Sequence, residues 1–152
     1  MDLISLLEKH KSSSGPRGEP FVDYNGVRLG YGDILARSER LGAVIGKYGF
    51  APGAVCGLVC FNHINFILYF TACLRARVVP LIISAKYGPD EMRGIVAASG
   101  VRAVITDNIY AFDGALTAGN GANVAVISPE IDAGSAAVEP GGLYGDTLAD
   151  GT

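Results

Sequence analysis

Residues 55–83, VCGLVCFNHINFILYFTACLRARVVPLII, decide the fold. The run at 55–61 is continuously apolar, which is typical of a strand that is covered on both faces of a parallel sheet. Residues 64–76 follow with the length and the apolar pattern of a helix, and a second apolar run occupies residues 78–83. Because a strand, a helix and a strand follow one another, we expect a parallel strand pair with a crossover helix.

Further helices and strands extend this unit in both directions along the chain. Apolar residues from Asp33 to Tyr48 recur at helical spacing, and Gly49 suits the left-handed position that ends a helix. Asn25-Gly26 lies between two short apolar arms and predicts a tight hairpin. The other expected elements are a helix at 1–10, a loop at 11–20, hairpin arms at 21–24 and 27–29, a helix that starts at Gly88 and stops at Gly100, strands at 102–106 and 124–128, and a helix at 108–116.

This order predicts an α/β fold: an N-terminal β-hairpin plus a mainly parallel sheet of about four strands, with crossover helices on its faces. Residues 1–129 are expected to form one α/β subdomain. From Glu130 onward Gly, Ala and Pro dominate and hydrophobic periodicity is lost. We therefore expect 130–152 to be a Gly/Ala-rich acidic tail or linker.

Composition excludes several classes of protein. The chain has 152 residues, of which 49% are hydrophobic and 18% charged, so it is not a disordered protein as a whole. The net charge is −3 and the basic residues are scattered, so we expect no nucleic-acid partner. The chain shows no signal-peptide pattern and no apolar run of about 18 residues, so no membrane span is expected.

Three cysteines, two of them in the apolar run at 55–61, cannot form a complete set of disulfides. Buried free cysteines behave as small hydrophobic residues, and free thiols fit a reducing compartment. We therefore expect a cytoplasmic protein. Cys56 and Cys60 have the spacing of half a metal site, but no second Cys pair or His cluster follows, so no metal site is predicted.

The motifs that bind phosphate or activate a nucleophile are missing from these residues. There is no G-x-x-x-x-G-K-[ST] loop, and Gly30-Tyr31-Gly32 lacks the third glycine of a dinucleotide-binding turn. The small residues at 12–18 (SSSGPRG) could bind an anion, although no strand precedes them, and a flexible connector is the simpler interpretation. His10 is expected to face solvent at a helix end. We assign no residue to catalysis, to a cofactor or to a metal.

Four side chains follow the predicted strands at the carboxyl edge of the sheet, where ligands bind in this architecture. They are Asn62, His63, Ser84 and Lys86. For each, a structural interpretation stays open: Asn62 can cap the following helix, His63 can be a helix-start residue, and Lys86 can be a solvated loop lysine.

Residues 21–107 resemble one known family, the adenylate-forming superfamily of acyl- and aryl-CoA ligases, luciferases and adenylation domains of nonribosomal peptide synthetases. The similar segments are LGYGDIL at 29–35 for "L-T-Y-x-E-L", YGFAPGAV at 48–55 for "L-G-V-x-P-G-D-x-V", ACLRARVVP at 72–80 for "A-C-L-R-A-G-V-V-P", YGPDE at 87–91 for "x-T-P-E-E", and SGVRAVITD at 99–107 for "S-G-A-R-x-V-I-T-D". The resemblance implies that the sheet is part of the large domain of such a ligase.

Three positions depart from the family pattern. The helix-capping Thr or Ser before the tyrosine is Gly30, and the Asp after Pro-Gly is Ala54. The glycine expected to let the helix and the next strand pack closely is Arg77.

The resemblance also implies cofactors for the complete enzyme: ATP, Mg²⁺, and CoA or a carrier-protein thiol. The family's Ser/Thr/Gly-rich phosphate loop, which ends in Lys, should come after this region and does not occur within residues 1–152. We therefore expect an N-terminal fragment or split part of a ligase that is not catalytic alone. Its expected partner is the rest of a ligase, in cis or in trans, or a second copy in a dimer. The alternative is a non-catalytic α/β protein-interaction module derived from that family.

Overall fold

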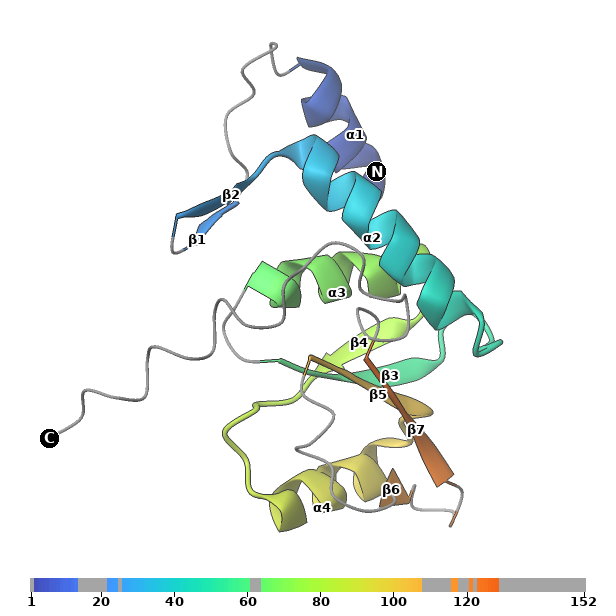
Figure 1. Cartoon of the computed structure of the whole chain (residues 1–152). Coiled ribbons are helices and arrows are strands. Elements are labelled where there is room, and N and C mark those ends of the chain that lie inside the picture. The colour runs from blue at the N-terminus through green and yellow to red at the C-terminus, as the bar shows by residue number, and fades with distance from the viewer. Residues whose placement is uncertain are drawn as a thin grey trace, which may run out of the picture.

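A computed structural model gives the three-dimensional structure of the chain (Figure 1). It describes residues 2–13, 22–24, 26–60, 64–107, 116–117, 121 and 123–128. The elements are α1 (Leu3–Ser13), β1 (Val22–Tyr24), β2 (Val27–Leu29), α2 (Tyr31–Gly46), β3 (Val55–Val59), α3 (Ile64–Arg75), β4 (Val79–Ile82), α4 (Pro89–Ser99), β5 (Ala103–Thr106), β6 (Leu116–Thr117) and β7 (Asn123–Ile127).

The main sheet has the strand order β4-β3-β5-β7-β6. β3 pairs in parallel with both β4 and β5, and β5 pairs in parallel with β7. β1 and β2 form a separate antiparallel hairpin, in which Gly26 takes the positive φ of 79° that its turn requires. The predicted fold class, a hairpin followed by four parallel strands with crossover helices, is confirmed.

Two expected boundaries are wrong. Leu116 was expected in a helix, but it lies in β6 and pairs antiparallel with Val124 of β7. Lys11 was expected in a loop, but it continues α1, which ends at Ser13. Both predictions relied on the local propensity of the residues. Strand pairing and helix packing are long-range effects, which local propensity does not include. The remainder of the helix expected at 108–116 and the tail expected at 130–152 lie outside the described residues, so the domain boundary stays a prediction.

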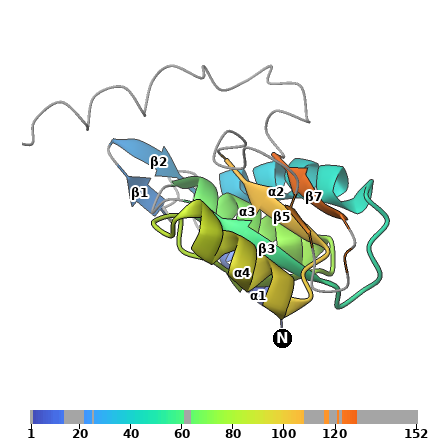
Figure 2. The same ribbon diagram turned by 90° about the horizontal axis from the view of Figure 1, so that it is seen from below.

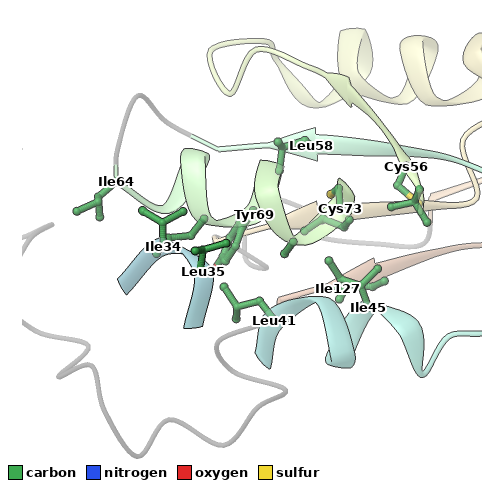
Figure 3. Packing of buried hydrophobic residues seen from close by; sticks show 14 of the residues in the cluster. Ile34, Leu35, Leu41, Ile45, Cys56, Leu58, Ile64, Tyr69, Cys73 and Ile127 are labelled. Atoms are coloured by element: carbon green, nitrogen blue, oxygen red, sulfur yellow. The ribbon is translucent and has the colours of Figure 1, made fainter. Parts of the chain in front are cut away.

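Helices cover both faces of the sheet. α1, α2 and α3 lie on one face, and α4 lies on the other (Figures 1 and 2). Alternating residues of β3 point to opposite faces of the sheet. Cys56 and Leu58 are buried under α2 and α3, whereas Val59 packs on the other face, with Met92 and Val96 of α4. Figure 3 shows Tyr69 and Cys73 of α3 pointing into the buried hydrophobic cluster that α2, α3 and β3 form together.

Gly57 allows close packing on the face of the sheet that α4 covers. A Cβ at this position would lie 3.0 Å from Cδ1 of Ile83 and 3.4 Å from Cγ2 of Val104. These neighbours occupy the space that a side chain would need, so the glycine lets residues of three strands meet under α4.

The turn after α3 contains a residue in an unusual backbone conformation. Arg77 has a φ of 58° and is the one described residue other than glycine with a positive φ. The Arg77 N–H donates to the Leu74 carbonyl (3.1 Å) and the Val78 N–H donates to the Cys73 carbonyl (3.0 Å), which is the Schellman arrangement that ends helices. The Arg77 carbonyl also accepts a hydrogen bond from Gly53 N–H at 2.8 Å. A glycine at this position would therefore suit the positive φ, whereas we had expected it to serve the helix–strand contact.

Strand β4 forms one edge of the sheet, and Pro80 lies on its open side. Val79 N–H donates to the Ala54 carbonyl at 2.8 Å, and Ile83 N–H donates to the Leu58 carbonyl at 3.0 Å. Since backbone groups alternate along a strand, position 80 faces away from β3. Proline removes no ladder hydrogen bond at this position, and it removes one donor from the open edge, to which the Ile82 N–H also points.

Candidate functional site

The order of the strands defines where a ligand would bind. From β3 the chain crosses to β4 on one side and then returns to β5 on the other, so the direction of winding reverses between β3 and β5. In open α/β sheets, ligands bind outside the carboxyl ends of the strands at such a reversal. The segment that follows β3 contains two of the four candidates, Asn62 and His63. Both lie outside the described residues, so their role stays a prediction.

The other two candidates, Ser84 and Lys86, lie in the exposed turn after β4. The Lys86 N–H donates to Ser84 Oγ at 3.3 Å, and Tyr87 N–H donates to the Ser84 carbonyl at 3.2 Å. Within the described part of the chain, the Lys86 ammonium makes no ion pair. This turn brings a hydroxyl and a cation close in sequence, but it follows the edge strand and not the reversal between β3 and β5.

The N-terminus of α4, which follows this turn, is capped by its own acid. Gly88 N–H donates to Glu91 Oε2 at 2.9 Å, and Asp90 Oδ1 lies 2.7 Å from Nη2 of Arg93. Carboxylates complement the positive end of a helix dipole, so this end is already neutralised. The interpretation of Asp90 and Glu91 as helix-start residues is therefore confirmed.

Polar residues at the ends of β5 and β7 were missed by the sequence analysis. Thr106 and Ser128 are buried, with 1% and 3% of their surfaces exposed, and Asp107 is half-buried. They lie at the carboxyl ends of strands at or beside the reversal, so they occupy the place where this architecture binds ligands. The sequence carried part of this signal, because Thr106 ends an apolar strand and Asp107 and Ser128 directly follow one.

The cysteines do not provide a nucleophile. Burial raises the pKa of the Cys56 thiol, and burial together with the neighbouring Cys56 raises the pKa of Cys73 to about 12. A thiol reacts as its thiolate, so both are inert at neutral pH. All three cysteines are free, and the prediction that Cys56 and Cys73 serve as small core residues is confirmed.

His10, the other residue considered as a site candidate, has a structural role. His10 is exposed and stacks on Tyr31, with ring centroids 5.5 Å apart, so it helps to join α1 to α2. Of the stretch at 12–18 that was expected to be a connector, Ser12 and Ser13 lie in the last turn of α1, and 14–18 lie outside the described residues. Over the described ranges, no group of three His, Cys, Asp or Glu residues could hold a metal ion. The same part of the chain contains no helix that is long and apolar enough to cross a membrane.

Comparison with known proteins agrees with this geometry. The sequence model of a family described as "AMP-binding enzyme" matches residues 9–141. A curated relative, 4-coumarate–CoA ligase 5 of Oryza sativa subsp. japonica, is 31% identical over 85 residues, which are 56% of this chain and 16% of the relative. The aligned part is thus about a sixth of that ligase.

Solved structures show the same fold at low identity. The N-terminal subdomain of NpsA from Klebsiella oxytoca, in complex with anthranilyl-AMSN, aligns with a TM-score of 0.73 and 11% identity, over 90% of this chain and 33% of that one. The nonribosomal peptide synthetase FmoA3, bound to alpha-methyl-L-serine-AMP, aligns with a TM-score of 0.70 and 18% identity, over 88% of this chain and 14% of that one. An artificial adenylation–PCP fusion of NpsA and ThdA aligns with a TM-score of 0.72 and 12% identity, over 86% and 23% of the two chains.

Proposed function

The chain belongs to the AMP-binding enzyme family, and from this membership we propose that residues 1–152 supply the first part of the nucleotide-binding subdomain of an adenylate-forming ligase. The reaction of the complete enzyme is the ATP-dependent activation of a carboxylic acid, followed by transfer to CoA or to a carrier-protein thiol. The observation that carries the proposal is the family match over 9–141, combined with a fold that aligns over 90% of this chain with the N-terminal subdomain of NpsA.

In this proposal the 152 residues provide a scaffold and do not perform the chemistry. Adenylation develops negative charge on a transferred phosphate, which must be stabilised by cations and by backbone N–H groups. The described residues offer no metal-binding cluster, and the N-terminus of α4 is neutralised by Glu91. ATP and Mg²⁺ therefore require residues from a further part of the fold, and no catalytic step is assigned to a residue of this chain.

The class of substrate is proposed from the curated relative alone. That relative is a 4-coumarate–CoA ligase, so we propose an aromatic carboxylic acid. We also propose that the protein works in the cytoplasm, where ATP and CoA are present and where its three thiols remain reduced. Its partner is the rest of a ligase, in the same polypeptide or in a separate one.

Sequencing the transcript that encodes these residues, together with its neighbouring genes, tests the proposal. We expect a Ser/Thr/Gly-rich loop that ends in Lys, encoded downstream in the same reading frame or by an adjacent gene. A locus that lacks such a loop would contradict the ligase proposal, and it would favour the alternative of a non-catalytic interaction module.

A further inference from the structure

Positively charged side chains collect at the amino edge of the main sheet, the edge from which its parallel strands start. Helices α2, α3 and α4 all end on this side, where β3, β4 and β5 begin (Figure 1). Each of the three connections from helix to strand contributes at least one cation. We call these residues the amino-edge patch: Lys47, Arg75, Arg77 and Arg102.

Backbone hydrogen bonds hold two members of the patch beside the start of β3. Gly53 N–H donates to the Arg77 carbonyl at 2.8 Å, and Arg102 N–H donates to the Val55 carbonyl at 2.8 Å. Arg77 and Arg102 therefore lie on either side of the chain that enters β3, about 10 Å or two strand spacings apart. The Debye length is also about 10 Å at 0.1 M salt, so the two charges act together on an anionic partner.

The other two members of the patch lie where α2 and α3 end. Arg75 packs against α2, because a Cβ at Gly42 would lie 3.1 Å from Cβ of Arg75. Lys47 is the C-cap residue of α2 and follows Gly42 by about 7.5 Å along the helix axis. Lys47, Arg77 and Arg102 are exposed, and Arg75 is half-buried.

No acidic side chain from the neighbouring sequence balances the patch. Residues 41–89 and 92–106 contain no Asp or Glu. Within the described part of the chain, none of the four patch residues forms an ion pair. Cations complement the negative end of a helix dipole, which carries about half a charge. Three helix ends thus offset about 1.5 of the four positive charges, and the remainder is open to an anionic partner.

The chain itself contains a segment of the opposite charge. Residues 130–152, which lie outside the described residues, contain five acids and no Lys, Arg or His: Glu130, Asp132, Glu139, Asp146 and Asp150. Strand β7 ends at Ile127 on the carboxyl edge of the sheet, and a strand of this length spans about 17 Å. Ten extended residues span up to about 35 Å, so the segment is long enough to return to the amino edge.

We propose that the acidic segment 130–152 docks on the amino-edge patch of its own chain. Each exposed charge pair contributes little by itself. A segment on a short linker, however, has an effective concentration in the millimolar range, so a weak contact is enough to keep it bound. An external anion, such as a nucleic acid or an acidic protein, has to compete with this tethered segment. The inference is independent of the ligase proposal, because it uses only the charges and the topology of this chain.

Carbodiimide coupling of carboxylates to lysine, followed by mass spectrometry, tests the docking. The reagent joins only groups in contact, and Lys47 is the lysine of the patch. Lys86 is the matched control, since it is also exposed but lies on the carboxyl edge, the side at which β7 ends. A segment without a docking site would meet Lys86 at least as often as Lys47. Acetylation with a small amine reagent should label both lysines equally and shows that both amines react.

A pair of double variants tests the part played by charge. Arg77→Gln with Arg102→Gln removes two charges from the patch and keeps Lys47. Arg28→Gln with Arg93→Gln is the control, because it removes two charges from exposed arginines outside the patch. All four side chains are exposed, so both double variants should keep the melting temperature of the parent protein within a few degrees.

We expect coupling of Lys47 to acids of 130–152 in the same chain, and little coupling of Lys86 to them. The yield at Lys47 should fall about fivefold in the patch variant, should stay unchanged in the control variant, and should be lost in 0.5 M NaCl. Equal yields at the two lysines, or no coupling at a normally reactive Lys47, would overturn the proposal. A mixture of chains with ¹⁴N and ¹⁵N identifies coupling between two copies, and coupling only between copies would overturn it as well.

Discussion

Arg75 Nε donates a hydrogen bond to Ser38 Oγ across 3.0 Å, and this bond joins α3 to α2 where the two helices cross. Ser38 is fully buried and its hydroxyl in turn donates to the Leu35 carbonyl at 3.1 Å. One turn further along α2, Gly42 faces the backbone of α3: a Cβ there would lie 3.1 Å from Cβ of Arg75 and 3.2 Å from the Ala72 carbonyl oxygen. A small residue and a polar contact therefore set the spacing of the two helices.

Gly42→Ala should destabilise the protein although alanine is the better helix former. The gain in helix propensity is about 1 kcal/mol, but the new methyl group meets a backbone carbonyl that cannot move alone, and overpacking costs about 1–3 kcal/mol. We expect a net loss of about 1 kcal/mol in the free energy of unfolding, measured by urea denaturation. Gly94→Ala is the matched control, because nothing lies within 4 Å of a Cβ in that helix, and it should be stabilising. Equal effects of the two substitutions would show that the helix crossing is not tight.

Ser38→Ala should lower the free energy of unfolding by about 1–2 kcal/mol, because a partly buried guanidinium loses its acceptor. The control is Ser99→Ala, since the Ser99 hydroxyl bonds only weakly, at 3.5 Å, to a carbonyl of its own helix. Urea denaturation of both variants measures the difference. If Ser38→Ala is no more destabilising than Ser99→Ala, the bond to Arg75 does not contribute to stability.

Arg77→Gly should stabilise the protein by about 1 kcal/mol, because glycine takes a positive φ without the steric cost that a side chain pays. Arg102→Gly serves as the control: Arg102 is also an exposed arginine before a strand, but its φ is not positive, so glycine only adds entropy to the unfolded chain. The melting temperature should rise for the first variant and fall for the second. A fall in both would mean that the Arg77 side chain makes a contribution larger than its backbone strain.

The buried thiol of Cys73 should make stability fall at alkaline pH. Its pKa is raised from 9.0 to about 12 in the folded protein, so between these values the folded state keeps a proton that the unfolded state has lost. The contribution is therefore fully present below pH 9 and decreases as the pH rises toward 12. Urea denaturation from pH 8 to pH 10.5 should show a shallower decline for Cys73→Ala than for the parent protein. Parallel pH profiles would contradict the raised pKa.

The sequence was sufficient for the parts of the fold that depend on local pattern. The apolar runs around Leu58 and Val104 and the Asn25-Gly26 turn each have a periodicity or a turn chemistry that few other structures accommodate. The short antiparallel strand at Leu116 could not be predicted, because its pairing with Val124 comes from tertiary contact. The left-handed Arg77 could not be predicted either, since an arginine gives no sign of a positive φ.

The candidate site was predictable only in its location. Parallel strands place their carboxyl ends at one edge, and this rule located Ser84 and Lys86 correctly after β4. It did not reveal that the reversal lies between β3 and β5, because strand order depends on which strands pair across the sheet. Thr106 and Ser128 were overlooked although each lies at the end of an apolar run, because nothing in the sequence marks their strands as the ones at or beside the reversal.

We propose that residues 1–152 form a scaffold that depends on further parts of an adenylate-forming enzyme for ATP chemistry. ATP–pyrophosphate exchange by the purified 152-residue chain, with Mg²⁺ and aromatic carboxylic acids, tests it most directly, with the rice 4-coumarate–CoA ligase as positive control. Calorimetric titration with ATP and Mg²⁺ accompanies the assay. We predict no exchange above background and no saturable ATP binding. Measurable exchange, or micromolar ATP binding that is lost in Lys86→Ala, would contradict the account.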